Sequence, residues 1–193
     1  MRIARTLVVL GFIVVATMVV AVGPAAAPPE CTWVGTPGPD SKVGTRGNDV
    51  LCGRGGNDRL FGGPGDDEIF AGPGNDFASG DSGHDTLHGG PGRDTLIGKG
   101  GDDQMFGGFG IDDGDGGWGD DILVGGPGGD FTLSGGASGM DLVLGGDGDD
   151  LCLATIDGSG NDEIGGGPGR DRFYKDPGDE VHGAEIPGPC FAE

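Results

Sequence analysis

Large apolar residues recur about once in every nine positions along most of this chain, and the positions between them are mainly glycine or polar. The stretch GGPGDDEIF at residues 62–70 is one such unit. It holds three glycines, one proline and three consecutive acids, a composition that disfavours a helix. We expect DEIF to form a short strand in which Ile69 points inward and its neighbours point outward. The preceding GGPG is expected to form a loop, because its glycines permit positive φ.

An acidic residue marks the same position of every unit. Starting from Asp67, steps of nine reach an unbroken series of eleven aspartates, and the series resumes after insertions of two and three residues. Its members are Asp40, Asp49, Asp58, Asp67, Asp76, Asp85, Asp94, Asp103, Asp112, Asp121, Asp130, Asp141, Asp150, Asp162 and Asp171, with Glu180 at the final step. A glycine stands two residues before each acid, so sixteen units fill residues 35–183 as one array.

The residue two positions after each acid is expected to face the interior. It is apolar in most units, and these residues are Leu51, Leu60, Ile69, Leu87, Leu96, Met105, Leu123, Val143, Cys152, Ile164 and Phe173. The weaker entries are Lys42, Ala78, Gly114, Thr132 and His182. Lys42 and His182 lie in the first and last units, where a stack of repeats needs atypical caps. Gly114 predicts a hole in the interior row, and the insertions at 134–144 and 154–165 predict bulges or locally broken ion sites.

Composition alone would indicate disorder. The 193 residues include 48 glycines and 32 acids against 11 bases, which gives a net charge of −21. Ordering nine residues costs roughly 13 kcal/mol, whereas one buried leucine returns about 2–3 kcal/mol. A divalent cation between acidic loops would supply the missing stabilisation and cancel the repulsion between carboxylates. The same charge argues against nucleic acid and anionic membranes as partners.

The units GGPGDDEIF (62–70), GGPGRDTLI (89–97), GGWGDDILV (116–124) and GGDGDDLCL (145–153) match the pattern G-G-x-G-x-D-x-U-x, where U is a large apolar residue. The chain therefore resembles the RTX, or hemolysin-type, calcium-binding nonapeptide repeat family. The resemblance implies an all-β fold, a parallel β-roll (β-solenoid) of about 16 nonapeptide turns stacked around bound Ca²⁺. Loops n and n+2 would stack on one rim, and all fifteen aspartates of the series would be calcium ligands.

Residues 1–27 resemble a secretory signal peptide, with Arg2 and Arg5, an apolar run and the small residues GPAAA. Cleavage after Ala27 would leave a cap segment at 28–34, the repeat roll at 35–183 and a tail at 184–193. We expect a Sec-exported, extracellular and bacterial protein whose mature chain does not span a membrane. An uncleaved membrane anchor is the alternative, although the apolar run is short for a span.

Four cysteines in an exported chain suggest disulfides. Three pairings are possible, of which Cys31–Cys52 with Cys152–Cys190 is the local one. A thiolate metal site is the alternative, but there is no C-x-x-C spacing.

No residue set outside the repeat pattern indicates catalysis. The segment HDTLH at 84–88 resembles a zinc-protease motif, but it lacks the glutamate and a helical setting, and Asp85 belongs to the acidic series. We therefore expect a secreted, non-enzymatic protein that binds several Ca²⁺ ions and folds on binding them. The alternative is a calcium-dependent adhesion or cell-surface scaffold module with an unknown extracellular partner.

Overall fold

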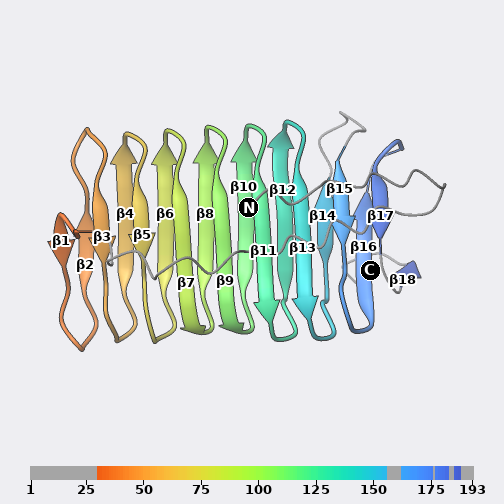
Figure 1. Cartoon of the computed structure of the whole chain (residues 1–193), viewed down its shortest axis with the longest axis horizontal. Helices are drawn as coiled ribbons and strands as arrows, with labels where there is room; N and C mark the ends of the chain where they lie inside the picture. The colour runs from red at the N-terminus through yellow and green to blue at the C-terminus, as the bar shows by residue number, and fades with distance from the viewer. Residues whose placement is uncertain (1–29, 156–161, 176, 183–184, 188–193) are drawn as a thin grey trace, which may run out of the picture.

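The computed structural model describes residues 30–155, 162–175, 177–182 and 185–187, and there the chain winds into a flattened solenoid with two parallel sheets (Figure 1). The odd sheet contains β1 (Trp33–Val34), β3 (Val50–Cys52), β5 (Glu68–Phe70), β7 (Thr86–Gly92), β9 (Gln104–Gly110), β11 (Ile122–Pro127), β13 (Leu142–Asp147), β15 (Glu163–Gly165) and β17 (Glu180–His182). The even sheet contains β2 (Ser41–Val43), β4 (Arg59–Pro64), β6 (Phe77–Ser82), β8 (Thr95–Gly100), β10 (Asp113–Trp118), β12 (Thr132–Ser138), β14 (Leu153–Thr155), β16 (Asp171–Lys175) and β18 (Glu185–Pro187).

Successive strands alternate between the sheets, and each strand pairs in parallel with the strand two further along the chain. For example, Glu68 of β5 is in register with Thr86 of β7, which is in register with Gln104 of β9. The predicted all-β parallel roll is confirmed. The predicted number of turns is wrong: two nonapeptides are needed to visit both sheets, so sixteen nonapeptides make about eight coils.

The interior is one column of apolar side chains, drawn alternately from the two sheets. The buried members are Leu51, Leu60, Ile69, Ala71, Ala78, Leu87, Leu96, Met105, Leu123, Leu133, Val143, Leu153, Ile164 and Phe173. Trp33 and Val181 pack against the two ends of this column. Each coil therefore buries only about two large side chains, which makes the column narrow for a protein of this length.

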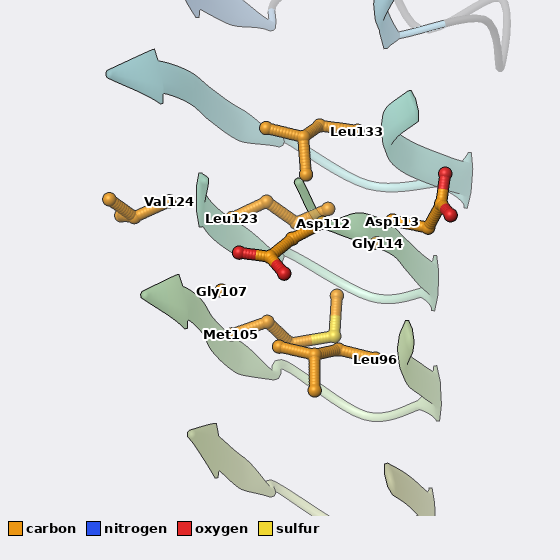
Figure 2. A pocket seen from close by; sticks show the side chains of 9 residues that line it. All are labelled: Leu96, Met105, Gly107, Asp112, Asp113, Gly114, Leu123, Val124 and Leu133. Carbon is orange, nitrogen blue, oxygen red and sulfur yellow. The ribbon is translucent and has the colours of Figure 1, made fainter. Parts of the chain in front are cut away.

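The predicted hole at Gly114 is confirmed. A cavity of about 10 Å³ lies beside it, surrounded by Leu96, Met105, Leu123 and Leu133 (Figure 2). The cavity is apolar, so we expect it to be dry. The absent side chain leaves Leu123 and Leu133 without a packing partner at this level of the column.

Two predicted interior positions are displaced by one residue. Leu133, not Thr132, is in register with Gly114 and is buried in the column. Leu153, not Cys152, pairs with Leu133 and is completely buried. Extra residues after Asp130 and Asp150 shift the strands, because the larger aliphatic side chain is drawn into the interior. The predicted irregularity near the first insertion is confirmed by a register shift between β10 and β12 at Gly117/Trp118.

A third displacement occurs in the last coil. Val181, not His182, is in register with the interior Ile164 and packs against the column. His182 is exposed and lies 3.5 Å from Glu163 through its Nε2 atom. The strand thus places its one aliphatic residue inside, although a count in nines selects the neighbouring histidine.

The first coil is tied to the second by the Cys31–Cys52 disulfide, which confirms that predicted pairing. Cys190 lies outside the described residues, so its pairing with Cys152 stays a prediction. The predicted signal peptide at 1–27 also lies outside them. Within the part of the chain that the structure describes, no helix has the length and apolar character required to cross a membrane.

Candidate calcium-binding loops

The aspartates of the nonapeptide series stack in two rows, one along each edge of the solenoid. The odd rim, whose acids precede odd strands, carries Asp49, Asp67, Asp85, Asp103, Asp121, Asp141 and Asp162. The even rim, whose acids precede even strands, carries Asp40, Asp58, Asp76, Asp94, Asp112, Asp130, Asp150 and Asp171. All fifteen predicted residues therefore fall on the rims. Every one except Asp40, which is half-buried, is buried.

A hydrogen bond joins each aspartate to the next coil. The N–H of Asp49 donates to Oδ1 of Asp67 at 2.7 Å, and the N–H of Asp67 donates to Oδ1 of Asp85 at 2.7 Å. The same bond recurs along both rims, through both insertions, to Asp162 and Asp171. Oδ1 therefore orders the backbone, and the rows of carboxylates stay aligned where the repeat length changes.

The second carboxylate oxygen is buried and receives no hydrogen bond in most of the described loops. This holds for Oδ2 of Asp58, Asp67, Asp76, Asp85, Asp94, Asp103, Asp112, Asp121, Asp130, Asp150 and Asp171. A buried charged oxygen without a partner is strongly unfavourable. A row of such atoms is what a cation bound between the loops would require.

The loop glycines bring backbone oxygens to the same place. A Cβ atom at Gly62, the first loop position, would lie 2.3 Å from Oδ2 of Asp67 and 2.8 Å from the carbonyl oxygen of Gly80 in the next coil. At Gly92, the fourth position, φ is +154° and a Cβ would lie 1.5 Å from the carbonyl oxygen of Gly74. Only glycine fits in these stacked loops. Carboxylate and carbonyl oxygens are the ligands that Ca²⁺ takes, so the residues present fit this ion.

Burial also changes the acidity of these carboxyl groups. Desolvation raises the pKa of Asp85, Asp94, Asp121 and Asp130 to about 7, and hydrogen bonds from the preceding coil offset part of that effect. The pKa of Asp103 and Asp150 is raised to about 6 by the same cause. Without a cation, the buried rows therefore favour protonation.

Threonines replace this open arrangement at the start of each row. Thr36 donates its N–H and its hydroxyl group to Oδ2 of Asp40, and Thr45 does the same for Asp49. The backbone N–H of Thr45 is the main cause of a lowered pKa at Asp49. These carboxylates already have donors, so Asp40 and Asp49 differ from the other thirteen.

Asp179, which counting in nines missed, continues the odd rim. Its Oδ1 lies 3.5 Å from the N–H nitrogen of Asp162, its side chain is buried, and Oδ2 accepts the hydroxyl group of Thr155 at 3.1 Å. Glu180, where the nine-residue count falls, is an exposed residue of β17. The apolar Val181 two residues after Asp179 was the available signal, because the spacing of acid and apolar residue is kept when the unit loses one residue.

The two histidines of HDTLH do not form a joint site. Nδ1 of His84 accepts the N–H of Asp102 in a loop of the odd rim, at 2.9 Å. His88 lies on the outer face of the odd sheet, where its ring stacks between Phe70 and Phe106. Among the described residues, no group of three or more histidines, cysteines or acids has the arrangement of an isolated metal centre.

The RTX calcium-binding nonapeptide repeat model matches residues 35–78, 79–113 and 115–131. The chain belongs to this family. Its RTX repeats bind Ca²⁺, and the rows of carboxylates with unpaired buried oxygens fit that ion. The match ends at residue 131, but the hydrogen-bonded rows of the RTX roll continue to Asp171. No curated protein matches the chain.

Proposed function

We propose that this RTX protein is an exported roll whose folding is coupled to the binding of several Ca²⁺ ions. The observation that carries the proposal is the row of buried Oδ2 atoms without hydrogen-bond donors on both rims. The ligands would be the thirteen aspartates from Asp58 to Asp171 in the series, together with carbonyl oxygens of the loop glycines. When bound, the ion supplies positive charge and oxygen coordination between coils.

Asp40, Asp49 and Asp179 act as the ends of the rows in this proposal. Threonine hydroxyl groups occupy their Oδ2 atoms, so a coil at either end needs no ion to satisfy them. This arrangement lets the stack stop without leaving an exposed, half-built ion site. Capping of this kind is a general need of repeat arrays.

RTX repeat proteins are generally secreted or extracellular, and the N-terminal signal-like sequence supports export of this one. The narrow interior supports coupled folding, because two large side chains per coil bury little apolar surface. The chain would be unfolded at low Ca²⁺ and would form the roll outside the cell, where the ion is abundant. We propose no catalytic activity, since the RTX roll is a structural calcium-binding fold.

The test combines equilibrium dialysis against ⁴⁵Ca²⁺ with far-UV circular dichroism of the mature chain. We expect several ions per chain, bound over the same Ca²⁺ range in which the strand signal appears. Binding of one ion or none, or a strand signal that is complete in EGTA, would contradict the proposal.

A second candidate is an adhesion or scaffold module. The outer face of the odd sheet supports it, because Phe70, His88 and Phe106 stack there with ring centroids 4.7 and 5.1 Å apart. Such half-exposed rings are typical of contact surfaces. Recovery of the wild-type chain, but not of a Phe70→Ser/Phe106→Ser variant, on cell-wall fractions in Ca²⁺ would support it. Equal recovery of both would contradict it.

A further inference from the structure

A groove of about 410 Å³ lies where the even rim meets the outer face of the even sheet. Its upper wall is formed by the residues just before the rim aspartates in three successive coils, Asn57, Asn75 and Arg93. Its floor is formed by the first residues of β4, β6 and β8, which are in register: Arg59, Phe77 and Thr95. The RTX pattern leaves all six positions unspecified, so calcium binding does not explain these residue types.

The two asparagines present hydrogen-bond donors to this groove. Oδ1 of Asn57 accepts the N–H of Asn75 at 3.0 Å, and Oδ1 of Asn75 accepts the N–H of Arg93 at 3.0 Å. Because each amide uses its oxygen along the rim, its NH₂ group is left to point elsewhere. On the odd rim, Asp66 fills the equivalent position and makes the same bond to His84 with a carboxylate. The even rim therefore shows donors where the odd rim shows an acid.

Two guanidinium groups add positive charge. Arg59 is exposed, and no acidic side chain in the described part of the chain forms an ion pair with it. Arg93 makes a long contact of 3.4 Å with Asp113, lies 5.8 Å from the Phe131 ring centroid, and remains about half-exposed.

The carboxylates nearest the groove do not cancel this charge at its surface. Asp58 is 1% exposed and Asp76 is 3% exposed. Oδ1 of each accepts a backbone N–H from the preceding coil, and Oδ2 of each is buried. In the calcium-bound roll these charges would be compensated by the ion. The groove is therefore a donor-rich, positive strip on an acidic protein.

We infer that this groove binds an acidic saccharide. The guanidinium groups would pair with its carboxylates, the asparagine amides would donate to hydroxyl or ring oxygens, and the half-buried ring of Phe77 would pack against a sugar face. Adjacent coils repeat these groups about every 4.8 Å. A long polyphosphate such as nucleic acid fits less well, because the remaining surface is strongly acidic. The inference rests on the proposed function, since the calcium-bound roll presents the groove.

Isothermal titration calorimetry with trigalacturonate tests it, with maltotriose as the uncharged probe and the same Ca²⁺ concentration in cell and syringe. The Asn57→Asp/Asn75→Asp variant keeps the acceptor oxygens that hold the rim, as Asp66 does, but replaces the amide donors with negative charge. We expect it to lower trigalacturonate affinity at least about tenfold. Arg59→Gln/Arg93→Gln should do the same, and maltotriose should bind at least about tenfold more weakly than trigalacturonate to the wild type.

Arg170→Gln/Arg172→Gln is the matched control. Arg170 occupies the same position on the even rim as Arg93, and Arg172 begins its strand face as Arg59 does, but both lie several coils away. This control should bind trigalacturonate like the wild type. Equal loss in the control, or no binding by a roll that circular dichroism shows to be folded, would overturn the groove. A roll that shows no response to Ca²⁺ would instead contradict the proposed function.

Discussion

The main-chain N–H of Asp67 donates a 2.7 Å hydrogen bond to Oδ1 of Asp85, which occupies the same position one coil further along the odd rim. One oxygen of each buried carboxylate thereby joins neighbouring coils, and the other is left for a cation. Backbone order and ion binding use the same side chain, so a change in one is expected to affect the other.

Replacing Asp85 with asparagine separates these two tasks. The substituted amide would keep an oxygen for the N–H of Asp67 but would lack the negative charge that a cation needs. We expect the Ca²⁺ midpoint of folding to rise about tenfold or more for Asp85→Asn, while calcium-free stability is unchanged or higher. A fluorescence-monitored Ca²⁺ titration measures the midpoint.

The control for that variant is Asp66→Asn. Asp66 is the exposed neighbour of the buried series, and Asn48 and Asn57 hold the equivalent bonds in other coils. We expect its midpoint to shift less than about threefold, because an exposed charge is screened by water. Equal shifts for both variants would indicate that general acidity, rather than the buried row, governs Ca²⁺ binding.

The stability of the calcium-free roll should fall as pH rises. Asp85, Asp94, Asp121 and Asp130 have a folded pKa of about 7 against an ordinary value of 3.8, so the folded state binds more protons than the unfolded state. Their stabilising contribution is complete below about pH 4 and disappears as pH rises toward 7. Thermal unfolding of calcium-free protein between pH 4 and 8 should show this decrease.

Calcium binding should have the opposite pH dependence. Protons and Ca²⁺ compete for the same carboxylates, so affinity for Ca²⁺ should increase from pH 5 to pH 8. Calorimetry in buffers of different ionisation enthalpy would measure the protons released. An affinity that does not change with pH would show that the buried carboxylates are not the ligands.

Gly114→Ala should stabilise the roll. The new Cβ would lie 3.3 Å from Cδ2 of both Leu123 and Leu133, and the adjoining cavity gives these methyl groups room to move. Reduced freedom of the unfolded chain adds about 0.4–1 kcal/mol. We expect a gain of about 1 kcal/mol in chemical denaturation with Ca²⁺ present. Gly110→Ala is the contrasting change and should destabilise the roll strongly, since φ is +140° and its Cβ would lie 1.5 Å from the carbonyl oxygen of Gly92.

Removing the first-coil disulfide should weaken the roll without changing its ion content. The bond closes a loop with a sequence separation of 21 residues, for which a loss of about 3 kcal/mol is expected in Cys31→Ala/Cys52→Ala. Denaturation with Ca²⁺ present measures the loss, and dialysis counts the ions. A lower ion count would show that the disulfide also orders ion-binding loops.

The sequence was sufficient to predict the roll and the identity of its rim residues, because acid, glycine and apolar residue recur at fixed offsets. Counting in nines failed where a unit changed length. At Leu133, Leu153 and Val181 the strand moved by one residue so that an aliphatic side chain entered the interior. A fixed period cannot express that preference, whereas the local spacing of acid and apolar residue can.

The chemistry of the row ends could not be read from the period either. Thr36 and Thr45 occupy loop positions where most other units have glycine, and their contacts with Asp40 and Asp49 depend on side-chain geometry. The donor-rich groove likewise combines residues from three coils at positions that the repeat leaves open. Such features arise from stacking, which brings residues 18 positions apart into contact.

The most direct test of the account is a crystal structure of the mature chain grown in millimolar CaCl₂, with anomalous diffraction data. The account predicts a column of anomalous peaks along each rim, each peak in contact with the Oδ2 atoms of stacked aspartates such as Asp67 and Asp85. An intact roll whose rims carry no anomalous peaks would contradict it.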